Sequence, residues 1–142
     1  MPKIYKYQKV TDKYTTYTIN DDEENRITEL CTINGDTYIS VPDDLKLLEQ
    51  PKQINLEPVK LTAELKEQIE EASPHIKLIK KRIVEDIRKK YSVEDELKII
   101  RNKINGIGEK EYAEYNNYVA SCIAVRRLEK EELIGEIDRS NN

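Results

Sequence analysis

The sequence predicts an α+β protein, with a small antiparallel β-hairpin or meander unit followed by a helical hairpin or bundle that ends in a long C-terminal helix. Asn34-Gly35 separates two segments rich in β-branched and aromatic residues, a strong signal for a tight hairpin turn. Beyond Leu61, apolar residues recur every three or four positions, which is the period of an amphipathic helix. We therefore expect an antiparallel β unit over residues 1–41, a proline-rich connector over 42–60 and a helical unit over 61–142.

The β unit is built around a hairpin formed by Ile27–Ile33 and Asp36–Val41. A single hairpin of this size is marginally stable in water. It therefore requires a third strand, from Tyr5–Val10 or Tyr14–Ile19, or a covering helix or another subunit. The pairs expected across the hairpin are Leu30 with Ile39, Thr28 with Val41, and Cys31 with Tyr38.

The connector over residues 42–60 carries three of the five prolines, Pro42, Pro51 and Pro58. Proline disrupts helix interiors and is confined to the edges of sheets. The segment is therefore expected to be extended. We interpret residues 51–60 as a strap that lies over one unit or reaches a neighbouring molecule.

The helical unit is organised around residues 73–91. Ser73 is a suitable N-cap residue, and Pro74 suits the first helical position because its missing N–H has no intrahelical partner there. Four isoleucines follow at spacings of three, four and four, so that they form one narrow stripe that we expect to be buried. They are Ile76, Ile79, Ile83 and Ile87.

Three further helices are predicted around this one, over residues 63–72, 93–104 and 109–133. Thr62 and Ser92 precede two of them as capping residues, and Asn105-Gly106 ends the second. We expect the apolar faces of these helices to cover the isoleucine stripe. The face expected for residues 93–104 consists of Val93, Leu97, Ile100 and Ile104.

Composition and charge limit the classes of function. The chain has 24 basic and 28 acidic side chains, and its net charge of −4 disfavours a general nucleic-acid binder. No apolar run approaches the ~20 residues of a membrane span, and the first ten residues do not read as a signal peptide. Cys31 and Cys122 are far apart in sequence, as expected for buried or half-buried thiols in a reducing compartment, so we expect the protein to be made in a cytoplasm.

The sequence contains no recognisable catalytic or metal-binding motif. His75 is the only histidine, and neither cysteine lies close to it in sequence. Gly106-Ile107-Gly108 lacks the preceding strand and the following Lys-Ser/Thr of a phosphate-binding loop. We therefore expect no catalytic residues, no metal, no cofactor and no small-molecule substrate, and we predict that the protein is not an enzyme.

Five residues are candidates for contacts with a partner. Lys77, Lys81 and Arg88 share one flank of the helix over 74–91, where they are available to phosphates or to an acidic protein surface. Leu78 and Ile99 lie about half a turn away from the apolar stripes of their helices, which makes them candidates for a subunit contact.

An ordered set of motifs resembles a group of small proteins encoded among the tail genes of tailed bacteriophages and prophages. The similarity covers about residues 37–133 and does not extend to the hairpin region before Thr37. Ala124-Val125 stands where the family has an aromatic residue followed by glycine. The motifs are Thr37–Asp43, Glu49–Pro51, Leu56–Val59, Ser73–Ile79, Tyr91–Leu97 and Tyr115–Val119 with Cys122.

The resemblance implies a structural or assembly protein of a phage tail, located in the virion, with itself and other tail proteins as partners. Two other functions remain open at this stage. One is a phage-encoded inhibitor of a bacterial defence nuclease, of the anti-CRISPR kind, that uses acidic patches to occupy a nucleic-acid channel. The other is a weak nucleic-acid binder that uses the basic helix over residues 74–91.

Overall fold

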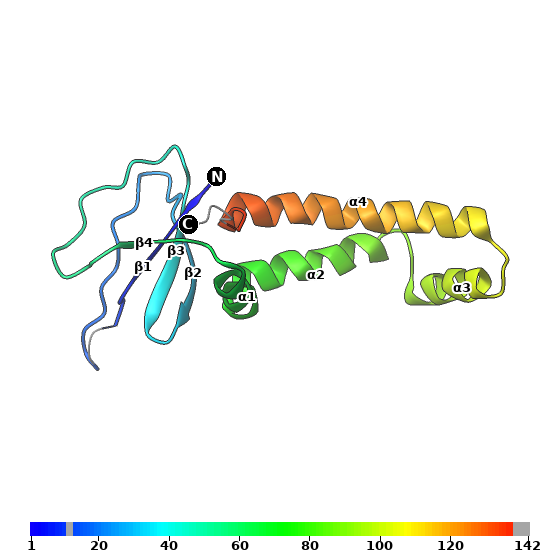
Figure 1. Ribbon diagram of the computed structural model, residues 1–142, viewed down its shortest axis with the longest axis horizontal. Coiled ribbons are helices and arrows are strands. Elements are labelled where there is room, and N and C mark those ends of the chain that lie inside the picture. The colour runs from blue at the N-terminus through cyan, green and yellow to red at the C-terminus, as the bar shows by residue number, and fades with distance from the viewer. Residues whose placement is uncertain (11–12, 138–142) are drawn as a thin grey trace. The chain divides into compact units, whose positions relative to one another are not determined.

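The computed structural model describes residues 1–10 and 13–137 (Figure 1). The predicted α+β class is confirmed, because these residues form a four-stranded antiparallel sheet and four helices, the last of them long. The strands are β1 (Lys3–Tyr7), β2 (Thr28–Ile33), β3 (Asp36–Val41) and β4 (Glu57–Val59). The helices are α1 (Ala63–Ala72), α2 (Pro74–Arg88), α3 (Val93–Ile104) and α4 (Glu109–Ile134).

The chain divides into two compact units. The first, here called the sheet module, comprises residues 1–77 and the described residues from 130 onward. The second, the helix module, comprises residues 78–129. This division differs from the expected boundaries at residues 41 and 60, because α1 and the adjoining ends of α2 and α4 pack with the sheet.

The hairpin is completed within its own chain. The strand order is β2-β3-β1-β4, and each neighbouring pair is antiparallel. The N-terminal segment supplies the third strand, β1, whereas Thr16 in the other expected segment forms an isolated bridge with Val10 outside the four strands. The fourth strand comes from the expected connector, and Pro58 lies in this edge strand, where a missing N–H is tolerated.

A β-bulge changes the register expected for the hairpin. Cys31 pairs with Tyr38 as predicted, but an irregularity between Glu29 and Cys31 makes Glu29 the partner of Ile39. The predicted pairs of Leu30 with Ile39 and of Thr28 with Val41 are therefore wrong. A bulge sets two residues against one on the facing strand. Leu30 and Cys31 consequently enter the same buried cluster.

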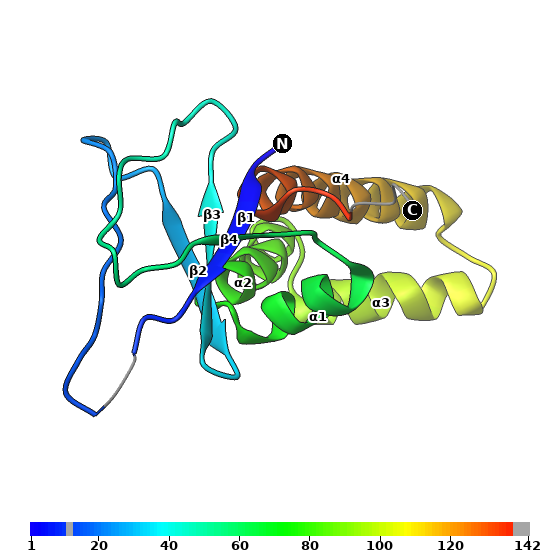
Figure 2. The ribbon, with the colours of Figure 1, turned by 60° about the vertical axis from the view of Figure 1, so that its left-hand side comes forward.

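One face of the sheet is covered by helices (Figure 2). Side chains from β1, β2 and β3 pack there with residues of α1, the first turn of α2 and the end of α4. Ile69 and Ile76 are fully buried in this cluster, so these two helices are anchored to the sheet. The buried members are Ile4, Leu30, Cys31, Tyr38, Leu61, Ile69, Ile76 and Ile134.

The other face is covered by the two long segments 13–27 and 42–56 (Figure 2). Tyr7, Ile39, Val41 and Ile54 are buried there. The segments are also joined to each other: Asn20 N–H donates to Gln50 Oε1 at 2.6 Å, and Gln50 Nε2 donates to the Asn20 carbonyl at 2.9 Å. Residues 42–56 of the connector thus lie over the chain's own sheet.

Ser73 does not cap α2 as the sequence suggested. Its hydroxyl is buried and has no hydrogen-bond partner among the residues that the structure describes. Its backbone N–H donates to the carbonyl of Ile69 and closes α1, and Pro74 takes the predicted first position of α2. Along the isoleucine stripe, Ile76 and Ile79 are buried, whereas Ile83 and Ile87 are only half-buried, so the expected burial holds for the first half of the stripe only.

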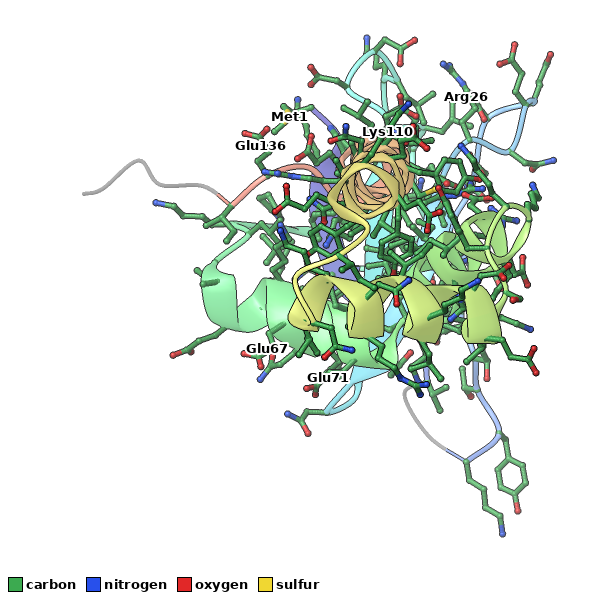
Figure 3. The ribbon with its side chains drawn as sticks, turned by 90° about the vertical axis from the view of Figure 1, so that its right-hand side faces the viewer. Met1, Arg26, Glu67, Glu71, Lys110 and Glu136 are labelled. Atoms are coloured by element: carbon green, nitrogen blue, oxygen red, sulfur yellow. The ribbon has the colours of Figure 1, made fainter. Side chains whose placement is uncertain are left out.

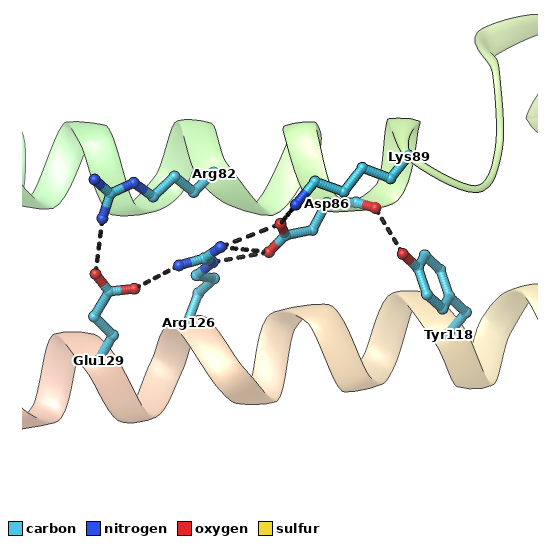
Figure 4. A network of polar contacts seen from close by, with 6 residues as sticks. All are labelled: Arg82, Asp86, Lys89, Tyr118, Arg126 and Glu129. Carbon is cyan, nitrogen blue, oxygen red and sulfur yellow. Dashed lines mark hydrogen bonds and ion pairs between the residues drawn. The ribbon is translucent and has the colours of Figure 1, made fainter.

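Polar contacts join α2 to α4 within the helix module (Figure 4). The Asp86 carboxylate accepts hydrogen bonds from Arg126 Nε at 2.8 Å and Nη2 at 3.1 Å. Glu129 accepts from Arg126 at 2.9 Å and from Arg82 at 3.0 Å, and Tyr118 Oη donates to the Asp86 carbonyl at 2.7 Å. The hydrogen bonds from Arg126 lower the pKa of Asp86. Arg126 of α4 is therefore the centre of this network.

Candidate protein-interaction surface

The helix α3 begins at a complete capping box. Ser92 Oγ accepts from the Asp95 N–H at 3.0 Å, and the Asp95 carboxylate accepts from the Ser92 N–H at 3.3 Å. Three acidic residues in the first turn and two basic residues in the last turn complement the helix dipole. This short helix therefore has a well-defined start and favourable electrostatics along its length.

One side of α3 is held within the helix module. Ile99 is buried on this side, and Glu96 lies one turn before it. Glu96 accepts a hydrogen bond from Tyr115 Oη of α4 at 2.6 Å and pairs with Arg88 at 3.2 Å. One turn after Ile99, Lys103 Nζ lies 5.3 Å from the ring centroid of Tyr112. These contacts fix the face of α3 that is turned toward the rest of the module.

The contact between Tyr115 and Glu96 changes the acidity of both groups. Partial burial, together with the hydrogen bond to Glu96, raises the pKa of Tyr115 to about 12. The pKa of Glu96 is lowered, first by the hydrogen bonds from Arg88 and then by the one from Tyr115. The arrangement is consistent with a charged acceptor that anchors α3 to α4.

A second side of α3 carries an exposed apolar stripe. Four residues at spacings of four, three and four fall within about 60° of one another around the helix axis. We call them the α3 stripe: Val93, Leu97, Ile100 and Ile104. Their exposed fractions are 53%, 55%, 37% and 79%. The expectation that this face would be buried in the helical unit is therefore wrong.

The α3 stripe extends into the turn that follows the helix and is flanked by charges. Ile107, three residues after the last stripe residue, is 58% exposed. Beside the stripe, on the side away from Glu96, lie Glu94 near the start of the helix and Arg101 near its end. Figure 3 views the helix module from the end near Lys110, with α3 running across the picture. An exposed apolar row rimmed by charges is typical of a protein-binding surface.

The five candidate contact residues proposed from the sequence differ in their exposure and in their contacts within the structure. Lys77 and Lys81 are exposed, and Leu78 is 45% exposed. Arg88 is engaged with Glu96, which neutralises part of the basic flank. Ile99 is only 7% exposed, so the prediction that it contacts a partner does not hold for the folded chain.

The α3 stripe was recognised as an amphipathic face but assigned to the core. Its spacing fits a buried face and an exposed interface equally well, so periodicity alone did not decide between them. The flanking charges gave a usable signal, because residues beside an intermolecular helix seam are frequently charged. Glu94, Arg101 and Lys103 all flank the stripe in this way.

The described residues contain no group of three His, Cys, Asp or Glu side chains that is placed to hold a metal ion. The sheet module has an open hollow of about 700 Å³, lined in part by Tyr7, Asp21, Glu29 and Glu49. Asp21 is occupied with its own loop, since its carboxylate accepts from the Asp22 N–H at 2.7 Å and the Ile27 N–H at 3.1 Å. The Asp21 carboxylate is therefore engaged by backbone groups of its own loop.

Comparisons with protein-family models, with curated proteins and with solved structures find no match to this chain. The resemblance to phage tail-region proteins thus rests on the sequence motifs alone. Across residues 1–10 and 13–137, every helix is too short or too polar to cross a membrane.

Proposed function

We propose that the protein works through protein–protein contacts made by its helix module, as a structural or assembly component, and that it does not act as an enzyme. The setting that we propose is the tail of a bacteriophage or its assembly machinery, with a location in the virion. That setting is supported by the ordered motifs between Thr37 and Cys122.

The observation that carries the proposal is the α3 stripe. A helix that is amphipathic in sequence lowers its free energy by burying its apolar face. Here the capping box and the contacts of Glu96 fix α3 in an orientation that leaves that face in solvent. A single exposed leucine is unremarkable, but four large aliphatic side chains in one row form a contiguous patch. Contact with another protein surface would bury this row.

The sheet module is a poorer candidate for the contact. Its hairpin is completed by two further strands, and both faces of the sheet are covered by the same chain, so the hairpin does not need another subunit to complete it. Of the two edge strands, β4 is only three residues long and contains Pro58, and β2 carries a β-bulge between Glu29 and Cys31; these features disfavour pairing with another strand.

Affinity purification from the native host tests the proposal, with the full-length protein as bait. A double variant, Leu97→Gln with Ile104→Gln, removes apolar surface from the α3 stripe while keeping good helix formers. Lys110→Gln, at an exposed position of α4, serves as the matched control. We expect the wild type and the control to recover tail or virion proteins, and the double variant to lose them.

Two results would contradict the proposal. One is recovery of the same proteins by the wild type and the double variant. The other is assembly of tails with normal infectivity when the gene is deleted. Recovery of a host nuclease complex instead of tail proteins would favour the inhibitor function.

A further inference from the structure

We propose that the partner of the α3 stripe is a second copy of the same chain, with the two α3 helices packed antiparallel about a two-fold axis. This inference rests on the proposed function, because it names the partner of the surface described above. Its basis is the order of charges along α3 together with the exposure of the stripe.

The spacing of the α3 stripe is that of a helix–helix seam. Alternating steps of four and three residues place apolar side chains along one line of contact between two helices. In an antiparallel pair, Val93 of one copy lies against Ile104 of the other, and Leu97 lies against Ile100. Each exposed member of the stripe then has an apolar partner.

The order of charges along α3 is complementary to that of a second α3 helix running in the opposite direction. Glu94, Asp95 and Glu96 lie in the first turn, whereas Arg101 and Lys103 lie in the last turn. Reversing one helix against the other brings the acidic end of each copy to the basic end of its partner. The two helix dipoles also oppose each other in this arrangement, which is the favourable orientation.

One flanking pair gives the arrangement its specificity. Glu94 and Arg101 lie on the same outer edge of the stripe, both exposed, on opposite sides of its midpoint, so that in the antiparallel pair they are offset by only about 3 Å along the helix axis. In the antiparallel pair, Glu94 of each copy meets Arg101 of the other, so that the contact occurs twice. In a parallel pair, Glu94 of one copy and Arg101 of the other lie on opposite edges of the seam and about 10 Å apart along the axis, so they do not meet.

The other edge of the stripe is already committed within the helix module. Glu96 is bonded to Tyr115 and Arg88, and Lys103 lies over the ring of Tyr112. These contacts hold α3 in place before association, so that little ordering is required when the second copy binds. A preordered surface binds with a smaller entropic cost.

Charge reversal tests the inference. The association of the full-length protein is measured by sedimentation over a wide concentration range, and circular dichroism verifies that each variant is folded. Glu94→Arg and Arg101→Glu should each raise the dimer dissociation constant by about tenfold or more, because each places like charges together twice. The double variant should restore the wild-type constant. Lys110→Glu, a charge reversal of the same size on α4, should leave it unchanged.

Cross-linking supplies an independent readout of orientation. A mixture of Val93→Cys and Ile104→Cys proteins should form mixed disulfide dimers, and neither protein alone should do so. Efficient dimers of Ile104→Cys alone would overturn the antiparallel arrangement, as would a double charge variant that stays as weak as the single ones.

A monomer at every concentration would overturn the inference altogether. If the Leu97→Gln and Ile104→Gln variant then still lost its protein partners in the purification, the proposed function would stand with a different partner. If that variant retained them, both would fail.

Discussion

The sheet of the sheet module and the helix α3 are both built from regularly spaced apolar residues, yet only the sheet is covered. Ile39, on β3, is fully buried beneath the segments 13–27 and 42–56. Ile104, on α3, is 79% exposed. The difference shows that an apolar pattern specifies a face, while the rest of the chain decides whether that face is buried within the molecule.

The long irregular segments of the sheet module serve to cover one face of the sheet. Residues 42–56 were expected as a connector, but their aliphatic side chains pack on β1 and β3. Leu45, Leu47 and Leu56 are half-buried there, and Ile54 is buried. No comparable segment follows α3, since the turn after it leads directly into α4. The stripe therefore stays exposed in the single chain.

The largest effect is expected from Ile39→Ala in the sheet. Ile39 has no exposed surface, and removing a fully buried isoleucine side chain costs about 2–5 kcal/mol of unfolding free energy. Urea denaturation of the full-length variant measures this loss. A loss below about 1 kcal/mol would mean that the irregular segments do not form a packed second layer.

A smaller difference in unfolding free energy is expected between alanine variants of two serines that both precede helices. Ser92→Ala removes the cap of α3 and should lower the unfolding free energy by about 1 kcal/mol. Ser73→Ala removes a buried hydroxyl without a partner among the described residues, so the unfolding free energy should stay the same or rise by up to about 1 kcal/mol. Thermal denaturation of both variants checks the contrast, and equal losses would contradict it.

The sequence predicted the helices and the hairpin turn better than it predicted which of their faces would be buried. The Asn34-Gly35 turn and all four helices were found, because turn chemistry and helical period are local properties. The bulge at Leu30 was missed because register depends on which face of the strand is buried, which only the assembled module determines.

The candidate surface shows the same limit. The residues of the α3 stripe were identified, but their exposure was not, because it depends on the angle at which α3 meets α4. Ile99 was proposed as a contact because it lies off the stripe, and for the same reason it faces the module and is buried. The sequence of a single helix does not show which of its two faces will lack an apolar partner in the folded chain.

A pH-dependent effect is expected from the anchor of α3. The pKa of Tyr115 is raised from its ordinary value of 10.0 to about 12 in the folded chain. A raised pKa stabilises the fold below the unfolded value, and this stabilisation is lost as the pH rises from about 10 toward 12. Tyr115→Phe should therefore flatten the alkaline decline in stability relative to the wild type. Equal declines would show that the phenol does not hold α3.

The smallest effect is expected from Leu97→Gln, in contrast to Ile39→Ala. Leu97 is 55% exposed, and both side chains suit a helix, so the unfolding free energy of the dilute protein should change by no more than about 0.5 kcal/mol. Denaturation at low protein concentration isolates this value from any contribution of association. A loss comparable to that of Ile39→Ala would mean that the stripe is buried within the monomer.

Thiol labelling of a Leu97→Cys variant tests the central claim most directly, namely that the α3 stripe is exposed in one chain and covered by a second. The wild type is the control, because its Cys31 and Cys122 are both buried. We predict labelling as fast as that of an exposed thiol in dilute protein, with the rate falling steadily as the protein concentration rises. Slow labelling at every concentration would show that the chain covers its own stripe, and fast labelling at every concentration would show that no second copy covers it.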